Sequence, residues 1–238
     1  MKKSSLWFVL LVVLSMVLAS CAPAATEAPA APAAPAATEA PAAAAPAADQ
    51  FFVFLPKGLD NPYWDNCRKG MEAKMAELGV KAEFLGPEIS NAAKQVEIFE
   101  NVIARKPAAI AVSPNDPATV MDSIAKATAA GIPVITWDAD APDSQRLLYI
   151  GTDNEAAGYT AGKKLAEILG GKGKVAILHG SLSALNAQQR VTGFERAIAE
   201  NPDMEIVATE ATEDSLDTAL SKAEALLQAY PDLAGFYG

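Results

Sequence analysis

One stretch decides the fold of this chain: AAIAVSPNDPATVMDSIAKATAAGIPVIT, residues 108–136. Its apolar run at 108–112 predicts a buried strand. Asp116 and Pro117 then give the start signal of a helix, with an aspartate as N-cap and a proline as the first helical residue. The helix is expected to run until Gly131 ends it, and the apolar run at 132–136 predicts a second strand. A strand, a helix and a strand in this order form a βαβ unit, so the two strands are expected to be parallel.

The same alternation continues on both sides of this unit. Upstream, strands are predicted at 51–55 and 80–85, and they are followed by helices at 62–78 and 90–104. Downstream, a short strand at 147–150 precedes a second run, in which helices at 153–169, 184–200 and 216–229 alternate with strands at 174–178, 204–208 and 234–237. Repeated βαβ units imply parallel sheets with helices on both faces. We therefore expect an α/β chain with two doubly wound parallel-sheet lobes, an N-terminal lobe at 50–151 and a C-terminal lobe at 152–238.

The first 49 residues are excluded from this fold. Two lysines precede an apolar stretch at 6–18, which is too short to span a membrane and fits the core of a signal peptide. The residues that end at Cys21 resemble a bacterial lipobox, in which the cysteine is lipidated after cleavage; the alternative is a chance cysteine. We expect a lipoprotein signal peptide at 1–21 and an Ala/Pro-rich tether at 22–49. A lipid on Cys21 would hold the chain in the cell envelope, outside the cytoplasm.

Composition excludes several classes of function. The chain has 238 residues, and its 29 acidic and 19 basic side chains give a net charge of −10, so it is a poor candidate for binding nucleic acid. Two cysteines and one histidine allow no disulfide framework, no four-cysteine zinc site and no histidine-rich metal cluster. The sequence has no G-x-S-x-G, no P-loop and no dinucleotide-binding glycine motif. We expect no cofactor, no metal and no catalytic residue, although a pair such as Asp138 and Asp140 could in principle act on a glycoside.

The predicted topology indicates where a ligand would bind. In open α/β sheets, ligands bind beyond the carboxyl ends of the strands. The segments to inspect are therefore 56–64, 113–116, 137–140 and 179–190. Their candidate ligand-binding residues are Asn61, Tyr63, Trp64, Trp137, Asp138, Asp140, Asn186 and Arg190. Aromatic rings cover the apolar faces of a sugar, and carboxylate, amide and guanidinium groups bind its hydroxyls, so this set suits a sugar.

Five of these residues also have a structural interpretation. Asn61 could serve only as a helix cap, and Trp64 could be a core residue. Asp138 could start a turn, Asp140 could be solvated, and Arg190 could form a surface ion pair. In the same segments, Lys57 is expected to be solvated and His179 to be a structural or rim histidine.

Six segments carry a resemblance to a known family. Residues 54–64, 111–116, 132–138, 149–154, 189–194 and 230–236 resemble, in this order, segments of the type I periplasmic binding proteins of simple-sugar ABC transporters, the ribose-binding-like group. The resemblance implies two lobes joined by a hinge. It also implies that Asn61, Tyr63 and Trp64 contact the sugar from the first lobe, that Asp138 binds two hydroxyls, and that Arg190 reaches in from the second lobe. The implied partners are a monosaccharide and an ABC permease with its ATPase. The protein would be a monomer that meets the membrane only through its lipid anchor.

Two departures accompany the resemblance. Many relatives have arginine directly after the aspartate, where this chain has Ala139. The stretches 55–58 and 137–140 also resemble receptors for rhamnose and for the furanosyl signal autoinducer-2, in which Lys57 would be a ligand. The alternative function is therefore a sensor of such a molecule that feeds a signalling receptor. Because 233–238 predicts a buried strand with no polar tail after it, we expect the second lobe to be incomplete at residue 238.

Overall fold

A computed structural model describes residues 50–238 of the chain. The predicted signal peptide at 1–21, the lipidation at Cys21 and the tether at 22–49 lie outside these residues. Within 50–238, none of the helices has the length and apolar character that crossing a membrane requires.

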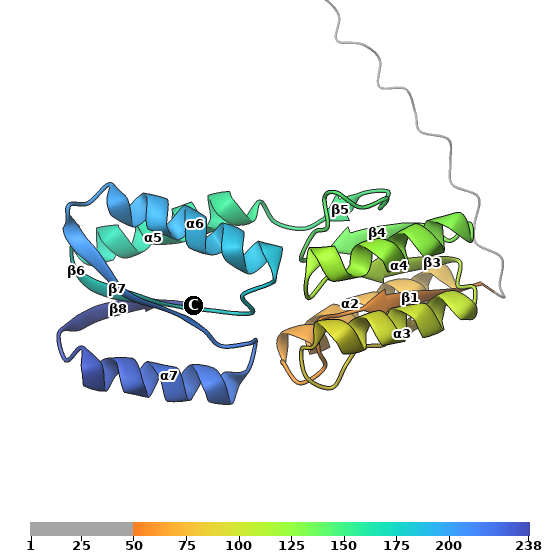
Figure 1. Ribbon diagram of the computed structural model, residues 1–238, viewed down its shortest axis with the longest axis horizontal. Coiled ribbons are helices and arrows are strands. Elements are labelled where there is room, and N and C mark those ends of the chain that lie inside the picture. Colours follow the sequence, from red (N-terminus) through yellow and green to blue (C-terminus); the bar gives the residue numbers. More distant parts are fainter. Residues whose placement is uncertain (1–49) are drawn as a thin grey trace, which may run out of the picture. The chain divides into compact units, whose positions relative to one another are not determined.

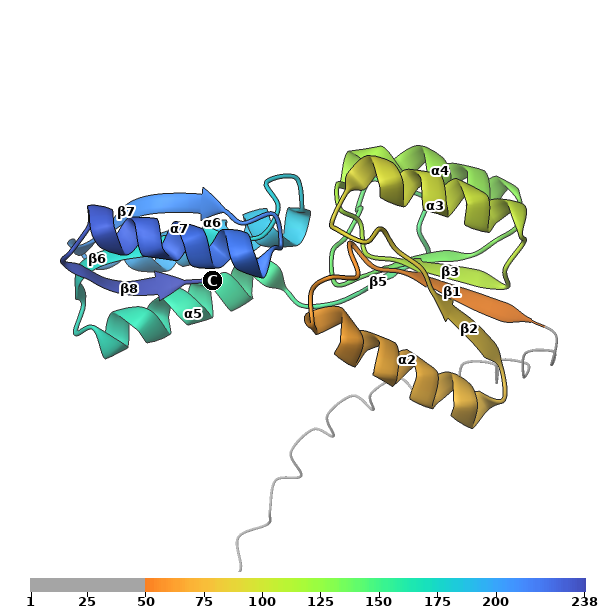
Figure 2. The same cartoon turned by 90° about the horizontal axis from the view of Figure 1, so that it is seen from below.

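The first lobe is built on a five-stranded parallel sheet with the order β2-β1-β3-β4-β5 (Figure 1). Its strands are β1 (Phe51–Leu55), β2 (Lys81–Phe84), β3 (Ala109–Val112), β4 (Val134–Trp137) and β5 (Tyr149–Ile150). Its helices are α2 (Tyr63–Leu78), α3 (Ala92–Ala104) and α4 (Pro117–Ala129). Figure 2 shows α3 and α4 on one face of the sheet and α2 on the other, which is the doubly wound arrangement that the sequence predicts.

Local signals set the ends of these elements. Asp116 caps α4 by accepting a hydrogen bond from the Ala118 backbone N–H at 2.8 Å, and Pro117 is the first helical residue, as predicted. Gly131 follows α4 in the left-handed conformation with φ +77°, which glycine adopts at low cost. At α2 the prediction is one residue early: the helix begins at Tyr63, and Asn61 Oδ1 accepts from the Tyr63 backbone N–H at 2.9 Å.

The core of the first lobe comes from the strands that the sequence identified. Val53, Leu55, Ile110 and Val112 are fully buried and pack with side chains of α3 and α4, among them Phe99. Burying one side chain of this size contributes about 1.5–3 kcal/mol. This core fixes the direction of β1, β3 and β4, and therefore the place where the loops after them begin.

The second lobe holds a three-stranded parallel sheet with the order β7-β6-β8. Its strands are β6 (Lys172–His179), β7 (Asp203–Ala211) and β8 (Leu233–Tyr237), and its helices are α5 (Asn154–Ile168), α6 (Leu185–Ala199) and α7 (Leu216–Ala229). Figure 1 shows α5 and α6 on one side of this sheet and α7 on the other. The structure thus confirms an α/β fold with two parallel sheets.

Strands β6 and β7 of the second lobe are several residues longer than predicted. β6 begins at Lys172 instead of residue 174, and β7 runs to Ala211 instead of residue 208. The two strands pair along their whole length, from Lys172 opposite Asp203 to His179 opposite Ala211, with one irregularity. Pairing with a neighbouring strand supplies the hydrogen bonds that extend a strand beyond its apolar centre. Because β7 is longer, the loop after it starts later than the sequence indicates.

Helices α5 and α6 approach each other backbone to backbone. A Cβ added at Gly158 of α5 would lie 2.8 Å from the carbonyl carbon of Arg190 in α6 and would overlap its oxygen. A Cβ added at Gly193 of α6 would lie 2.7 Å from the backbone N of Tyr159. Only glycine allows this spacing, so α6 is held in one position against α5.

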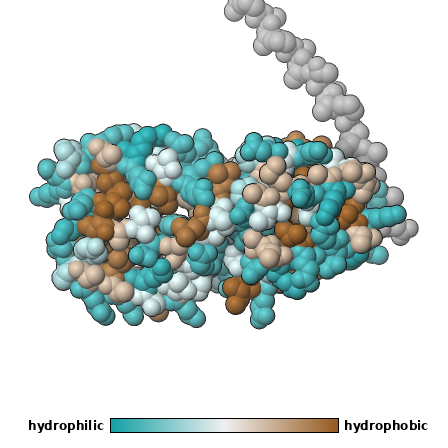
Figure 3. Space-filling model, in the orientation of Figure 1, coloured by the Kyte–Doolittle hydropathy of each residue, from teal (hydrophilic) through white to brown (hydrophobic). Residues whose placement is uncertain are grey.

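The second lobe leaves apolar side chains uncovered. Leu216, Leu220 and Leu227 of α7 are each more than half exposed, and their spacing places them on one side of the helix. Figure 3 shows further apolar residues gathered on the visible face of this lobe.

Candidate functional site

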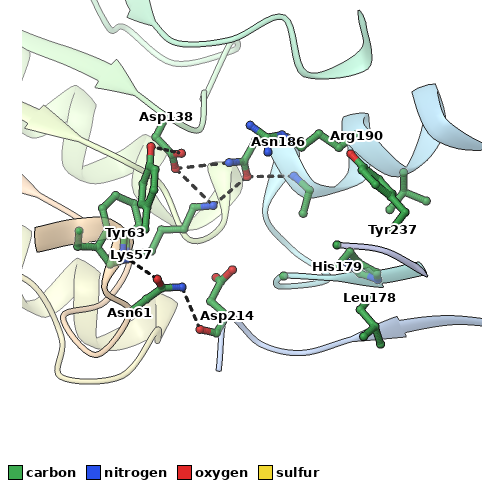
Figure 4. A pocket seen from close by; sticks show the side chains of 15 residues that line it. Lys57, Asn61, Tyr63, Asp138, Leu178, His179, Asn186, Arg190, Asp214 and Tyr237 are labelled. Atoms are coloured by element: carbon green, nitrogen blue, oxygen red, sulfur yellow. Dashed lines mark hydrogen bonds and ion pairs between the residues drawn. The ribbon is translucent and has the colours of Figure 1, made fainter. Parts of the chain in front are cut away.

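A pocket lies at the carboxyl ends of strands from both sheets (Figure 4). Residues after β1 and β4 line it from the first lobe, and residues at the ends of β6, β7 and β8 line it from the second. Its volume is about 220 Å³. Because a water molecule occupies about 30 Å³, roughly seven waters would fill this space, so it suits a small ligand.

Six of the eight predicted site residues line this pocket. They are Asn61, Tyr63, Trp64, Asp138, Asn186 and Arg190. The structure therefore brings together side chains from three predicted segments that are far apart in sequence. Trp137 and Asp140 do not line it.

Asp138 is the centre of the polar network in the pocket. Its Oδ1 accepts a hydrogen bond from the Tyr63 hydroxyl at 3.3 Å. Its Oδ2 accepts from the Ser113 hydroxyl at 2.8 Å and from Asn186 Nδ2 at 3.4 Å. Asp138 has φ +62°, a left-handed conformation that a non-glycine residue adopts only when its surroundings hold it there. The loop after β4 thus holds this carboxylate at the pocket through a strained backbone conformation.

Lys57 is buried, which corrects the expectation that it is solvated. The residue is 4% exposed, and Nζ donates to Asn186 Oδ1 at 2.8 Å. Nζ also lies 3.6 Å from Asp138 Oδ2. The ammonium group from the first lobe is therefore held by an amide of the second lobe and a carboxylate of its own lobe, as Figure 4 shows.

Asp214 is a pocket residue that the sequence analysis missed. Its backbone oxygen accepts from Asn61 Nδ2 at 3.3 Å, and its carboxylate lies 3.5 Å from the Ser90 hydroxyl. It follows β7, so the same topological rule, applied to the loop after this strand, could have found it. Asn61 has a double role, since its Oδ1 caps α2 while its Nδ2 faces the pocket.

Arg190 is held in place at one nitrogen. It is an exposed residue of α6, and its Nε donates to Asn154 Oδ1 at 2.8 Å. Beside it, Tyr237 lines the pocket and stacks on Phe194, with ring centroids 4.3 Å apart and an interplanar angle of 2°. His179 also lines the pocket, and within residues 50–238 its buried Nδ1 has no hydrogen-bond partner.

Trp137 packs behind the pocket and is not among the residues that line it. Its ring contacts Trp64 edge to face, with centroids 5.4 Å apart, and it also contacts Phe54 and Phe84. The four rings come from β1, β2, β4 and α2, and Trp64 is the member of the cluster that lines the pocket.

Asp140 is engaged in an ion pair, which also keeps it away from the pocket. Both carboxylate oxygens accept hydrogen bonds from Arg146, and Oδ1 also accepts from the Thr136 hydroxyl at 2.6 Å. Burial alone would raise the pKa of Asp140, but the hydrogen bonds from Arg146 and Thr136 outweigh it and hold this pKa below its usual value. Asp140 is therefore ionised near neutral pH and fastens the loop that carries Asp138.

The pocket offers hydrogen bonds and a balanced charge. Lys57 and Arg190 contribute positive charge, while Asp138 and Asp214 contribute negative charge. Burial, followed by the nearby Asp138 carboxylate, raises the pKa of Tyr63, so its hydroxyl stays protonated and can donate. Residues 50–238 contain no group of three or more side chains arranged to hold a metal ion. The arrangement can therefore bind a small neutral molecule that has several hydroxyl groups.

The pocket at the carboxyl ends of two parallel sheets defines a two-lobed binding protein. Residues 52–238 match the family model of the periplasmic binding protein domain, and the chain belongs to this family. The ribose import binding protein of Bacillus subtilis (strain 168) is 27% identical over 179 residues, which are 75% of this chain and 58% of that protein. The family resemblance predicted from the sequence is thus confirmed.

Solved structures agree with this assignment. An ABC transporter solute binding protein from Burkholderia graminis, in complex with D-arabinose, is 37% identical with a TM-score of 0.77, and the match covers 80% of this chain and 65% of that chain. GanP, a glucose-galactose binding protein from Geobacillus stearothermophilus, is 41% identical with a TM-score of 0.74, and the match covers 79% of this chain and 68% of that chain. The chain spans about 60% of the length of the curated relatives it matches. All of these relatives are binding proteins by name, in agreement with the prediction of a binding protein and not an enzyme.

Proposed function

We propose that this chain is the substrate-binding component of a sugar ABC importer. It captures a monosaccharide in the pocket between its two lobes, 50–151 and 152–238, and delivers it to a membrane permease with its ATPase. The observation that carries this proposal is the convergence of Asp138, Asn61, Asn186 and Arg190, from both lobes, on one small pocket. The relatives solved with D-arabinose or named for glucose and galactose support a sugar as the ligand class.

Each group in the pocket has a role in this proposal. Trp64 and Tyr63 cover an apolar face of the sugar ring. Asp138 accepts hydrogen bonds from two hydroxyls, and Asn186 and Arg190 bind hydroxyls from the other side. Trp137 and Asp140, although predicted to touch the ligand, support Trp64 and the loop of Asp138 instead.

The charge in the pocket indicates which sugars fit. Two cationic and two anionic side chains line it, so a neutral sugar enters without leaving an unpaired charge. A sugar acid or a phosphorylated sugar would add negative charge beside Asp138 and Asp214. We therefore expect neutral pentoses or hexoses to bind and anionic sugars to be rejected.

A thermal-shift titration of the full chain tests the proposal. The panel holds D-ribose, D-arabinose, D-allose, D-glucose and D-galactose, each raised from micromolar to millimolar concentration. A ligand at 100 times its Kd stabilises the fold by about 2.7 kcal/mol, which raises the Tm by roughly 5–10 °C for a domain of this size. Asp138→Asn should abolish the shift, whereas Asp143→Asn, at an exposed position in the same loop, should retain it. A folded protein whose Tm no sugar changes contradicts the proposal.

The position of Lys57 supports the alternative function, a sensor of rhamnose or autoinducer-2. In the receptors for rhamnose and autoinducer-2 that the sequence also resembles, this lysine would be a ligand, and here it is buried at the pocket. Rhamnose and autoinducer-2 therefore form a second arm of the same titration. A shift with either of them alone, and with none of the other sugars, favours the sensor.

We also propose that the lipid on Cys21 is the only link between the chain and the membrane and that the protein is a monomer. Metabolic labelling with radioactive palmitate tests the anchor: the wild type should be labelled and Cys21→Ser should not. Light scattering of the soluble Cys21→Ser chain gives its mass. Label in the Cys21→Ser variant refutes the lipid anchor at Cys21. A mass of two chains refutes the monomer.

A further inference from the structure

Two side chains outside the pocket connect the ligand groups of its opposite sides. The Tyr149 hydroxyl donates to the backbone oxygen of Asp138 at 2.9 Å. The same hydroxyl accepts from Asn154 Nδ2 at 3.3 Å, and Asn154 Oδ1 accepts from Arg190 Nε at 2.8 Å. An unbroken series of three hydrogen bonds therefore runs from Asp138 in the first lobe to Arg190 in the second. Both intermediate residues belong to the segment 149–154, which connects the two sheets.

The Asp138 end of this series holds a strained residue. Asp138 has φ +62°, and a non-glycine residue keeps such a conformation only where its surroundings determine it. Both of its backbone groups are bound by the β5 segment, because its N–H donates to Ile150 O at 3.1 Å and its oxygen accepts from Tyr149. The β5 segment therefore sets the direction in which the Asp138 carboxylate enters the pocket.

The Arg190 end positions a flexible side chain. An exposed arginine loses considerable rotamer freedom when it binds a ligand, so holding it beforehand reduces that cost. Asn154 can hold it because it is itself buried, 3% exposed, and fixed by a hydrogen bond from its Nδ2 to Thr152 O at 3.0 Å. With Nε bound to Asn154, the guanidinium is oriented before a ligand arrives.

The backbone holds Tyr149 and Asn154 in place. The Tyr149 ring folds over Gly151, where an added Cβ would lie 2.7 Å from Cε2 of the ring. Asn154 is the first residue of α5, and Gly158 of the same helix packs directly on the backbone of Arg190. Asn154 and Arg190 are therefore held together by the packing of α5 on α6, and within this series the bond from Asn154 to Tyr149 is the one that joins the second lobe to the first.

We propose that Tyr149 and Asn154 are positioning residues that align Arg190 with Asp138 for binding. This inference rests on the proposed sugar-binding function. Burial raises the pKa of Tyr149, so its hydroxyl remains protonated and able to donate at neutral pH.

Two measurements on the full chain test this inference. The first needs no ligand: the Nε–H signal of Arg190 in a proton–nitrogen NMR spectrum, assigned by its loss in Arg190→Lys. Asn154→Ala should expose this proton to fast exchange with water, and Tyr149→Phe should raise its exchange rate. The second is the Kd for whichever panel sugar shifts the Tm most. Because one hydrogen bond contributes about 0.5–1.5 kcal/mol, Tyr149→Phe should raise the Kd about two- to tenfold.

Tyr230→Phe is the matched control. It removes a tyrosine hydroxyl that donates to the backbone oxygen of Val207 at 3.3 Å, outside the pocket lining. It should change neither the Arg190 signal nor the Kd. If Tyr149→Phe behaves like this control in both measurements, the positioning role is wrong although the chain still binds sugar. If no sugar binds the wild type, the proposed function fails, and the NMR signal alone still decides whether Tyr149 and Asn154 hold Arg190.

Discussion

Replacing Gly158 by alanine tests the contact that positions α6. The new Cβ would overlap the backbone oxygen of Arg190 and lie 2.8 Å from its carbonyl carbon, whereas ordinary contacts are 3.4–4 Å, so α6 must move by more than about 1 Å. These neighbours are backbone atoms and cannot rotate away. Overpacking of this kind costs about 3 kcal/mol, and the better helix propensity of alanine returns about 1 kcal/mol. The net loss is about 2 kcal/mol, or a Tm that is about 4–8 °C lower.

Gly70→Ala is the matched comparison for this change. Gly70 lies inside α2, and a Cβ added there meets no other atom within 4 Å. Only the helix propensity then acts, so the Tm should rise by about 2–4 °C. Thermal unfolding of both variants, followed by far-ultraviolet circular dichroism, gives the two shifts. A Gly158→Ala protein as stable as the Gly70→Ala protein would show that α5 and α6 are not packed as described.

Two further predictions concern buried polar groups of the first lobe. Gln95 is fully buried; it donates to the backbone oxygens of Pro56 and Ser113 and accepts from the Asn115 N–H. Gln95→Leu should therefore lower the free energy of unfolding in urea by about 2–4 kcal/mol, whereas Gln228→Leu, at an exposed position, should change it by less than about 0.5 kcal/mol. Equal effects of the two substitutions would exclude this role of Gln95. The Asp140–Arg146 pair should make stability depend on pH, because the pKa of Asp140 is lower in the folded chain than in the unfolded chain. The pair therefore stabilises the fold at a pH above 3.8, the usual pKa of aspartate, and this stabilisation is lost as the pH falls through the lower pKa of the folded chain. The difference in urea midpoint between wild type and Arg146→Met should therefore be larger at about pH 7 than at about pH 2.5, and a difference that stays constant would contradict the assignment.

The amino-acid sequence determined the architecture because its signals are local. Apolar runs of strand length, the Asp116-Pro117 cap and the glycines behind helices each act within a few residues, and they predicted α7 and β1 with their observed bounds. The repeated βαβ pattern then fixed the direction of the strands. Since ligands bind beyond the carboxyl ends of such strands, the sequence also indicated the edge where Asn61, Asp138, Asn186 and Arg190 meet.

The tertiary structure decided which side chain faces the pocket. Lys57 is buried because Asn186, 129 positions away, accepts its hydrogen bond, and no local pattern shows that partner. Asp140 turns away because Arg146 and Thr136 satisfy it, while Trp137 packs among aromatic side chains of three different elements. Burial, ion pairing and orientation depend on distances between residues that are remote in sequence, and those distances are set only when the sheets and helices have packed.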